Sequence, residues 1–156
     1  MDEAGTVVQW LTEEGKTLAT AESCTGGLLG KLLTDVFGAS KAYLGGVISY
    51  AYEVKQKLLG VDATLLKEKG AVCAEVAEQM ALGVRRELQS DFALATTGNA
   101  GPSADPNNPN VGEIYIALAV GESVFCRKLY LHGSRDENRK EACRAALCLL
   151  LEKKSK

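Results

Sequence analysis

The sequence contains few of the residues that build metal centres or nucleic-acid surfaces. It has one histidine, His132, among 156 residues. A histidine-rich metal site is therefore excluded, and a Ser-His-Asp triad would depend on this one residue. The formal net charge is −2, so the chain lacks the basic excess that is typical of proteins that bind nucleic acid. We expect no metal and no nucleic-acid partner.

Disulfide, secretion and membrane signals are also missing. The five cysteines are odd in number and include no C-x-x-C pair, which indicates a reducing compartment without a disulfide framework or zinc site. The first residues, with Asp2 and Glu3, do not show the basic and then apolar pattern of a signal peptide. No apolar run approaches the length of a membrane span. We expect a cytoplasmic protein without a membrane partner.

The remaining pattern is that of one α/β domain covering residues 1–156. Hydrophobic residues make up 46% and charged residues 24%, which is ordinary for a globular chain. Apolar periodicity, glycine stops and a capping box at Ser134 and Glu137 predict the elements. The expected helices span 1–15, 25–37, 53–59, 62–69, 75–88 and 134–153. The expected strands span 17–21, 43–50, 92–97, 114–120 and 124–131. Their alternation predicts an α/β/α sandwich with a mixed, partly parallel sheet.

A cluster of hydroxyl, thiol and glycine groups stands where the first strand meets the second helix. It reads Thr-Ala-Glu-Ser-Cys-Thr-Gly-Gly over 20–27. Free backbone N–H groups and the positive end of the helix dipole at such a junction can hold an anion or an oxyanion. The local sequence alone is equally compatible with Ser23 or Thr25 as a helix cap. Cys24 is a rival nucleophile, but a small buried filler is the better interpretation.

Other polar segments follow strands or open helices, and they are expected at the same sheet edge. These are 50–55, 98–112 and the start of the last helix at 133–139. The segment 98–110 holds all three prolines of the chain. Long ordered loops in small domains are often functional, so this loop is a candidate wall of a site.

Four segments, in order and suitably spaced, resemble motifs of one known family. They are A-E-S-C-T-G-G at 21–27, V-I-S-Y with Lys55 and L-G-V at 47–61, G-A-V with E-V-A and M-A at 70–81, and T-G-N-A-G-P with V-G and Y-I-A at 97–117. Together they resemble the CinA C-terminal domain family, which includes the stand-alone nicotinamide mononucleotide amidohydrolases. The resemblance covers nearly the whole chain.

The resemblance implies hydrolysis of the carboxamide of nicotinamide mononucleotide to nicotinate mononucleotide and ammonia, by a serine mechanism without metal or cofactor. It implies Ser23 as nucleophile, Tyr50 and Lys55 as proton-transfer partners, and Arg135 as the completing arginine, with Arg139 second. The implied substrate-binding residues are Cys24, Thr25, Gly26, Gly27, Thr97, Gly98, Gly101 and Arg139. Self-association into a homodimer or larger homo-oligomer is a further expectation from the family.

These residue types suit those roles. A serine hydroxyl needs a base, and Lys55 can serve if burial or a nearby guanidinium lowers its pKa. Arg135 can pair with a phosphate, while backbone N–H groups near Gly26 or in 98–101 can form an oxyanion hole. Each residue also has a plain alternative, since Tyr50 can be a strand-end aromatic, Lys55 a solvated helix residue and Arg135 an exposed helix start.

Two other functions compete with the amidohydrolase. One is a non-catalytic nucleotide-binding or partner-binding module linked to competence or DNA damage, and the other is an amidase for another small metabolite. The second is motivated by departures from the family pattern. These are Tyr52, Cys73, Asn99, Ser134 and the proline- and asparagine-containing stretch 103–110. Cys73 should leave a helix without its usual cap, and the altered loop should change substrate preference.

Overall fold

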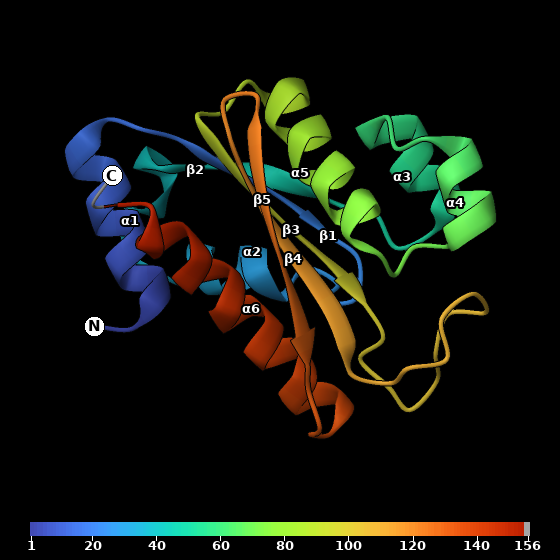
Figure 1. Cartoon of the computed structure of the whole chain (residues 1–156). Coiled ribbons are helices and arrows are strands. Elements are labelled where there is room, and N and C mark those ends of the chain that lie inside the picture. Colours follow the sequence, from blue (N-terminus) through green and yellow to red (C-terminus); the bar gives the residue numbers. More distant parts are fainter. Residues whose placement is uncertain (155–156) are drawn as a thin grey trace.

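A five-stranded mixed sheet lies between two layers of helices (Figure 1). The computed structural model describes residues 1–154, so 155–156, the end of the predicted domain, lie outside the described residues. Its strands follow the order β2-β1-β3-β4-β5. β1 is parallel to β2 and β3, whereas β3–β4 and β4–β5 are antiparallel, which confirms the predicted sheet. The bounds are Leu18–Glu22 (β1), Tyr43–Ile48 (β2), Phe92–Gly98 (β3), Glu113–Val120 (β4) and Ser123–Tyr130 (β5).

The helices divide between the two faces of this sheet (Figure 1). Their bounds are Glu3–Glu14 (α1), Leu28–Thr34 (α2), Ala39–Lys41 (η1, a 3₁₀ turn), Tyr52–Leu59 (α3), Ala63–Lys69 (α4), Ala74–Leu88 (α5) and Arg135–Glu152 (α6). α1, α2 and α6 cover one face, and α3, α4 and α5 lie on the other. The predicted capping box opens α6. Among the described residues, no helix is both long and apolar enough to cross a bilayer.

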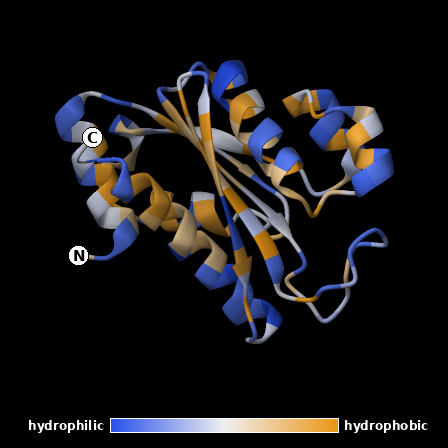
Figure 2. Ribbon diagram, in the orientation of Figure 1, coloured by the Kyte–Doolittle hydropathy of each residue, from blue (hydrophilic) through white to orange (hydrophobic). Residues whose placement is uncertain are grey.

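The two faces of the sheet carry side chains of different size. Leu18, Leu94 and Leu118 point towards α1 and α6, where they join the larger core. The alternate positions of β1, β3 and β4 are alanines, which pack against α5. The period of two along each strand thus separates a bulky face from a small-residue face. Figure 2 shows the apolar residues gathered where the helices meet the sheet.

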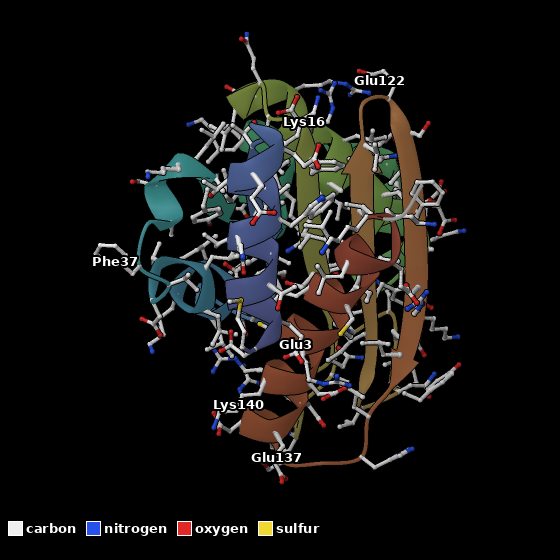
Figure 3. All side chains as sticks on the ribbon, turned by 90° about the vertical axis from the view of Figure 1, so that its left-hand side faces the viewer. Glu3, Lys16, Phe37, Glu122, Glu137 and Lys140 are labelled. Atoms are coloured by element: carbon white, nitrogen blue, oxygen red, sulfur yellow. The ribbon has the colours of Figure 1, made fainter. Side chains whose placement is uncertain are left out.

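The outer surface of the α1 and α6 layer is mostly charged. Figure 3 shows Glu3, Glu137 and Lys140 turned to solvent there. Phe37 is also fully exposed, on the segment between α2 and η1. The buried apolar side chains of α1, α2 and α6 pack against the sheet, as expected for amphipathic helices that cover one of its faces.

The predicted helix over 25–37 is wrong at both ends, because α2 begins only at Leu28 and ends at Thr34. Gly26 and Gly27 have positive φ angles of 57° and 101°, so the chain turns before the helix starts. Gly27 occupies the cap position without a side-chain hydrogen bond. Neither Ser23 nor Thr25 is therefore the cap of α2, which removes the plain structural reading of both residues.

Gly83 should tolerate no larger residue, although it lies inside helix α5. A Cβ at this position would lie 2.0 Å from the backbone oxygen of Leu59. Glycine to alanine in a helix interior is normally stabilising by about 1 kcal/mol. We expect Gly83→Ala instead to lower the free energy of unfolding by about 1–3 kcal/mol, because α5 must move away from its neighbour.

Urea denaturation of the purified variants measures this difference. Gly5→Ala in α1 is the matched control, since its Cβ would meet mainly the flexible end of Met1. We expect this control to be neutral or stabilising. Equal stability of Gly83→Ala and the parent protein would contradict the close packing of α5.

Candidate functional site

The loops that follow β1 and β3 enclose a cavity of about 200 Å³. The segment between β2 and α3, the start of α6, and Ala71 and Val72 between α4 and α5 complete its wall. The predicted polar segments therefore do meet at one sheet edge. The residues that line it include Ser23, Cys24, Tyr50, Tyr52, Thr97, Gly98, Asp105 and Arg135. The long loop after β3 lies on the same side of the molecule as α3 and α4 in Figure 1, next to the start of α3 and the end of α4. The cavity therefore collects residues from five separate parts of the chain.

Ser23 lines this cavity and is in direct contact with Lys55, which lies outside the lining. Lys55 Nζ lies 2.8 Å from Ser23 Oγ. The same nitrogen donates to the carbonyl oxygens of Ser49 at 2.6 Å and of Tyr50 at 3.1 Å. The Lys55 side chain is completely buried and Ser23 is only 7% exposed. The reading of Lys55 as a solvated helix residue is therefore wrong.

Burial lowers the pKa of Lys55 to about 8. Removing an ammonium group from water disfavours its charged form, while Cys24 and then Asp105 act on the pKa in the opposite direction with smaller effects. Of the two causes expected from the sequence, burial rather than a guanidinium produces the shift. A substantial fraction of Lys55 is thus neutral near pH 8.

Cys24 differs from Ser23 in its chemistry although both line the cavity. Burial raises the pKa of the Cys24 thiol to about 12. A thiol nucleophile must be a thiolate, and this group stays protonated at ordinary pH. The interpretation of Cys24 as a buried filler therefore fits better than that of a rival nucleophile.

Arg135 and Arg139, both near the start of α6, differ in their contacts. Arg135 lines the cavity, and its Nη1 donates to the carbonyl oxygen of Gly101 at 2.7 Å. Arg139 instead donates to the carbonyl oxygens of Cys24 at 3.1 Å and Thr25 at 2.8 Å, which anchors the loop after β1. Arg135 is placed to meet a ligand, and Arg139 is placed to hold the loop that presents Ser23.

Glu22 is the residue whose role the sequence did not reveal. Its carboxylate, 2% exposed, accepts hydrogen bonds from Thr25 Oγ1 at 2.7 Å and from the amides of Gly27, Leu29 and Gly30 at 3.2, 2.8 and 3.0 Å. A carboxylate at this end of a helix also interacts favourably with the helix dipole. The signal available in the sequence was an acidic residue at the end of an otherwise apolar strand.

The expected anion site at the start of α2 is therefore wrong, since the chain fills it with its own carboxylate. The amide of Gly26 is also engaged, because it donates to the carbonyl oxygen of Ser23. Of the two proposed sources of oxyanion donors, only the segment 98–101 faces the cavity, through Gly98 and Ala100.

The other residues expected at the site divide between its wall and its surroundings. Thr97 and Gly98 line the cavity, and Thr97 Oγ1 also donates to the carbonyl oxygen of Ala71 at 2.8 Å. Tyr50 stands at the rim with its side chain 64% exposed, and its carbonyl group rather than its hydroxyl contacts Lys55. Outside the lining lie Thr25, Gly26, Gly27 and Gly101, which shape the loops behind it.

The loop after β3 is held by polar side chains rather than by an apolar core. Asn99 Nδ2 donates to the carbonyl oxygens of Asn108 at 2.9 Å and Asn110 at 3.1 Å, while its Oδ1 accepts from the amide of Asp105 at 2.8 Å. The Tyr52 hydroxyl donates to Asp105 Oδ2 at 2.5 Å. Three of the departures from the family pattern thus lie in one hydrogen-bonded network.

Cys73 behaves as its sequence position predicts. It is the cap residue of α5, and its side chain makes no capping hydrogen bond. Its thiol lies 3.8 Å from the carbonyl oxygen of Gly70 instead. The missing cap lies at the start of α5, and Cys73 itself is not among the residues that line the cavity.

Comparisons with known proteins agree with the four motifs and with the fold. The family model of the CinA C-terminal domain matches residues 2–154. The chain belongs to this family. A putative competence-damage inducible protein of Caldanaerobacter subterraneus subsp. tengcongensis is 49% identical over 133 residues, which are 85% of this chain and 32% of that protein. A CinA-like protein of Geobacter sulfurreducens is 48% identical over 130 residues, 83% of this chain and 32% of that protein. The CinA domain described here thus spans about a third of these relatives.

Solved structures of the CinA superfamily have the same fold. One from Escherichia coli matches with a TM-score of 0.92 at 29% identity, covering 96% of this chain and 87% of that chain. The competence/damage inducible protein CihA from Agrobacterium tumefaciens matches with a TM-score of 0.91 at 34% identity, covering 96% and 92%. The mixed α/β architecture predicted from the sequence is therefore that of known CinA proteins.

Replacing Glu22 by the isosteric glutamine should destabilise the CinA domain. The amide nitrogen of the new side chain would face N–H groups of α2 that now bind a carboxylate oxygen. We expect Glu22→Gln to lower the free energy of unfolding by about 1–3 kcal/mol. Chemical denaturation measures the change, with the exposed Glu68→Gln in α4 as control. Unchanged stability would show that the carboxylate does not hold the start of α2.

Proposed function

We propose that this chain hydrolyses the carboxamide of nicotinamide mononucleotide, with Ser23 as nucleophile and Lys55 as its base. The observation that carries the proposal is the 2.8 Å contact of Lys55 Nζ with Ser23 Oγ, made by a completely buried lysine. A serine next to a group that can take its proton is the arrangement that nucleophilic catalysis requires. The choice of nicotinamide mononucleotide as substrate comes from the resemblance to the CinA C-terminal domain family.

The surroundings of Lys55 Nζ favour a base in the right orientation. A neutral amine has two hydrogens and one lone pair. The carbonyl oxygens of Ser49 and Tyr50 can only accept hydrogen bonds, so they take the two hydrogens. The lone pair then faces the Ser23 hydroxyl. The lowered pKa of about 8 keeps enough of the neutral form for this step at physiological pH.

The proposed reaction has two stages. Lys55 takes the proton of Ser23 while Oγ bonds to the amide carbon, and the resulting ammonium returns this proton to the leaving nitrogen, which departs as ammonia. The nicotinoyl ester on Ser23 is then hydrolysed by water, whose proton also passes through Lys55 back to Ser23. The products are nicotinate mononucleotide and free enzyme. Amides of the segment 98–101 are the proposed oxyanion donors, and Arg135 the proposed phosphate partner.

Ammonia release from nicotinamide mononucleotide, measured without added metal, tests the activity. We expect release by the parent protein and a fall of at least about 10³-fold in kcat/KM for Ser23→Ala, because no other residue replaces the nucleophile. The exposed Ser40→Ala is the matched control and should be unaffected. Release that persists in Ser23→Ala would end the serine mechanism, and no release by the folded parent would end this choice of substrate.

The pH profile tests Lys55 as the base. Only the neutral amine can accept the serine proton, so kcat/KM should rise about tenfold per pH unit below the pKa of about 8 and level off above it. Lys55→Arg stays charged at every accessible pH, and we expect it to lose the activity and the inflection together. An unchanged inflection in this variant would assign the titration to another group.

Tyr50 should matter less than Lys55. The carbonyl group that holds Lys55 belongs to the backbone and survives in Tyr50→Phe, while the exposed hydroxyl does not touch Ser23. We expect less than about a tenfold fall in kcat/KM for this variant, with the inflection near pH 8 retained. A fall as large as that of Lys55→Arg would place the Tyr50 hydroxyl in the proton transfer.

A further inference from the structure

The cavity carries one charged side chain of each sign in its wall. Among the described residues that line it, Asp105 carries the negative charge and Arg135 the positive charge. They do not pair with each other, since the Arg135 guanidinium donates to the carbonyl oxygen of Gly101 and the Asp105 carboxylate accepts elsewhere. Two separate side chains of opposite charge therefore line the same cavity as Ser23.

Asp105 is fixed by neutral groups. Its Oδ2 accepts from the Tyr52 hydroxyl at 2.5 Å, its Oδ1 from the amide of Asn107 at 2.9 Å, and its own amide donates to Asn99 at 2.8 Å. Gly70 leaves the space that this carboxylate fills, because a Cβ there would lie 2.5 Å from Oδ1. Hydrogen bonds of this kind position the carboxylate without cancelling its negative charge.

The charge of Asp105 is felt at the reacting groups. Burial lowers the pKa of Lys55, and Asp105 is among the groups that oppose this shift. The carboxylate thus acts across the cavity on the ammonium beside Ser23. A charged ligand that occupies the cavity also interacts with this carboxylate.

We propose that Asp105 makes the cavity selective for amides carried on a positively charged ring, so that it is a specificity-determining residue. This inference rests on the proposed amide hydrolysis at Ser23. A pyridinium ring directly attached to the amide places its positive charge in the negative half of the cavity, while a phosphate on the same ligand suits Arg135. The 1,4-dihydro form of nicotinamide mononucleotide has nearly the same shape with an uncharged ring and lacks this attraction.

A carboxylate can also accept hydrogen bonds from ribose hydroxyl groups. In that case it would contribute equally to ligands with charged and uncharged rings. The ratio of the two affinities separates these readings, because a contact with ribose cancels in the ratio and an interaction with ring charge does not.

Calorimetric titration of the Ser23→Ala protein with nicotinamide mononucleotide and with its 1,4-dihydro form measures this ratio without turnover. We expect the oxidised form to bind about tenfold more tightly. Adding Asp105→Asn, which keeps the size of the side chain and an oxygen for Tyr52, should reduce the preference to about one. Adding Glu68→Gln, an exposed charge removal on α4, should leave it unchanged.

Tyr52→Phe distinguishes the effect of the Asp105 charge from that of the hydrogen bond that Asp105 accepts from Tyr52. This variant removes a hydroxyl from Asp105 but keeps the carboxylate, so the tenfold preference should persist. A preference that stays the same in the Asp105→Asn protein, or that is absent before this substitution, overturns the proposal.

The outcome is distinguishable from a failure of the hydrolysis itself. Ammonia release by the parent protein together with an unchanged ratio in Asp105→Asn would leave the amidohydrolase standing and remove Asp105 as a selector. No ammonia release together with a ratio that falls to one would remove the hydrolysis and keep a cavity that selects positively charged rings. Absence of binding by both ligands would overturn the selectivity.

Discussion

The contact on which the site depends is that of a buried amine with a buried hydroxyl. Lys55 has lost its water, and two backbone carbonyl groups between β2 and α3 replace it. Burial and three hydrogen-bond contacts hold the Lys55 amine beside the serine hydroxyl, so little side-chain freedom remains to be lost when a ligand binds. The start of α3 and the end of β1 must therefore keep a fixed distance, and the close packing of α3 on α5 through Gly83 supports that distance.

The loop that presents Ser23 is also held by hydrogen bonds between backbone groups and buried side chains of the same chain. The buried Glu22 carboxylate accepts hydrogen bonds from the amides at the start of α2. Arg139 of α6 donates hydrogen bonds to two carbonyl oxygens of the loop. A nucleophile positioned by such bonds needs little rearrangement before it reacts, which is how electrostatic preorganisation lowers a barrier. The start of α2 thus stabilises the loop, and the proposed recognition of a phosphate depends on a side chain, Arg135, instead.

Periodicity and glycine stops were sufficient to predict the five strands, their mixed sheet and the convergence of polar segments at one edge, since these follow from local patterns. The early end of α2 and the roles of Glu22 and Arg139 could not be predicted in this way. They depend on hydrogen bonds between side chains and backbone groups that only the fold brings together, such as Arg139 with Cys24. The burial of Lys55 could not be predicted either. Its helix is short, and its neighbours in sequence are mostly exposed.

The network around the loop after β3 has a consequence for substitutions within it. Tyr52, Asn99 and Asp105 each depart from the family pattern or lie in the altered stretch, and each is bonded to another of the three. Exchanging any one of them alone removes a hydrogen bond from its partner. The effects of substitutions at residues that share such a network are not additive, so a change at one of these positions alters the effect of a change at the other two.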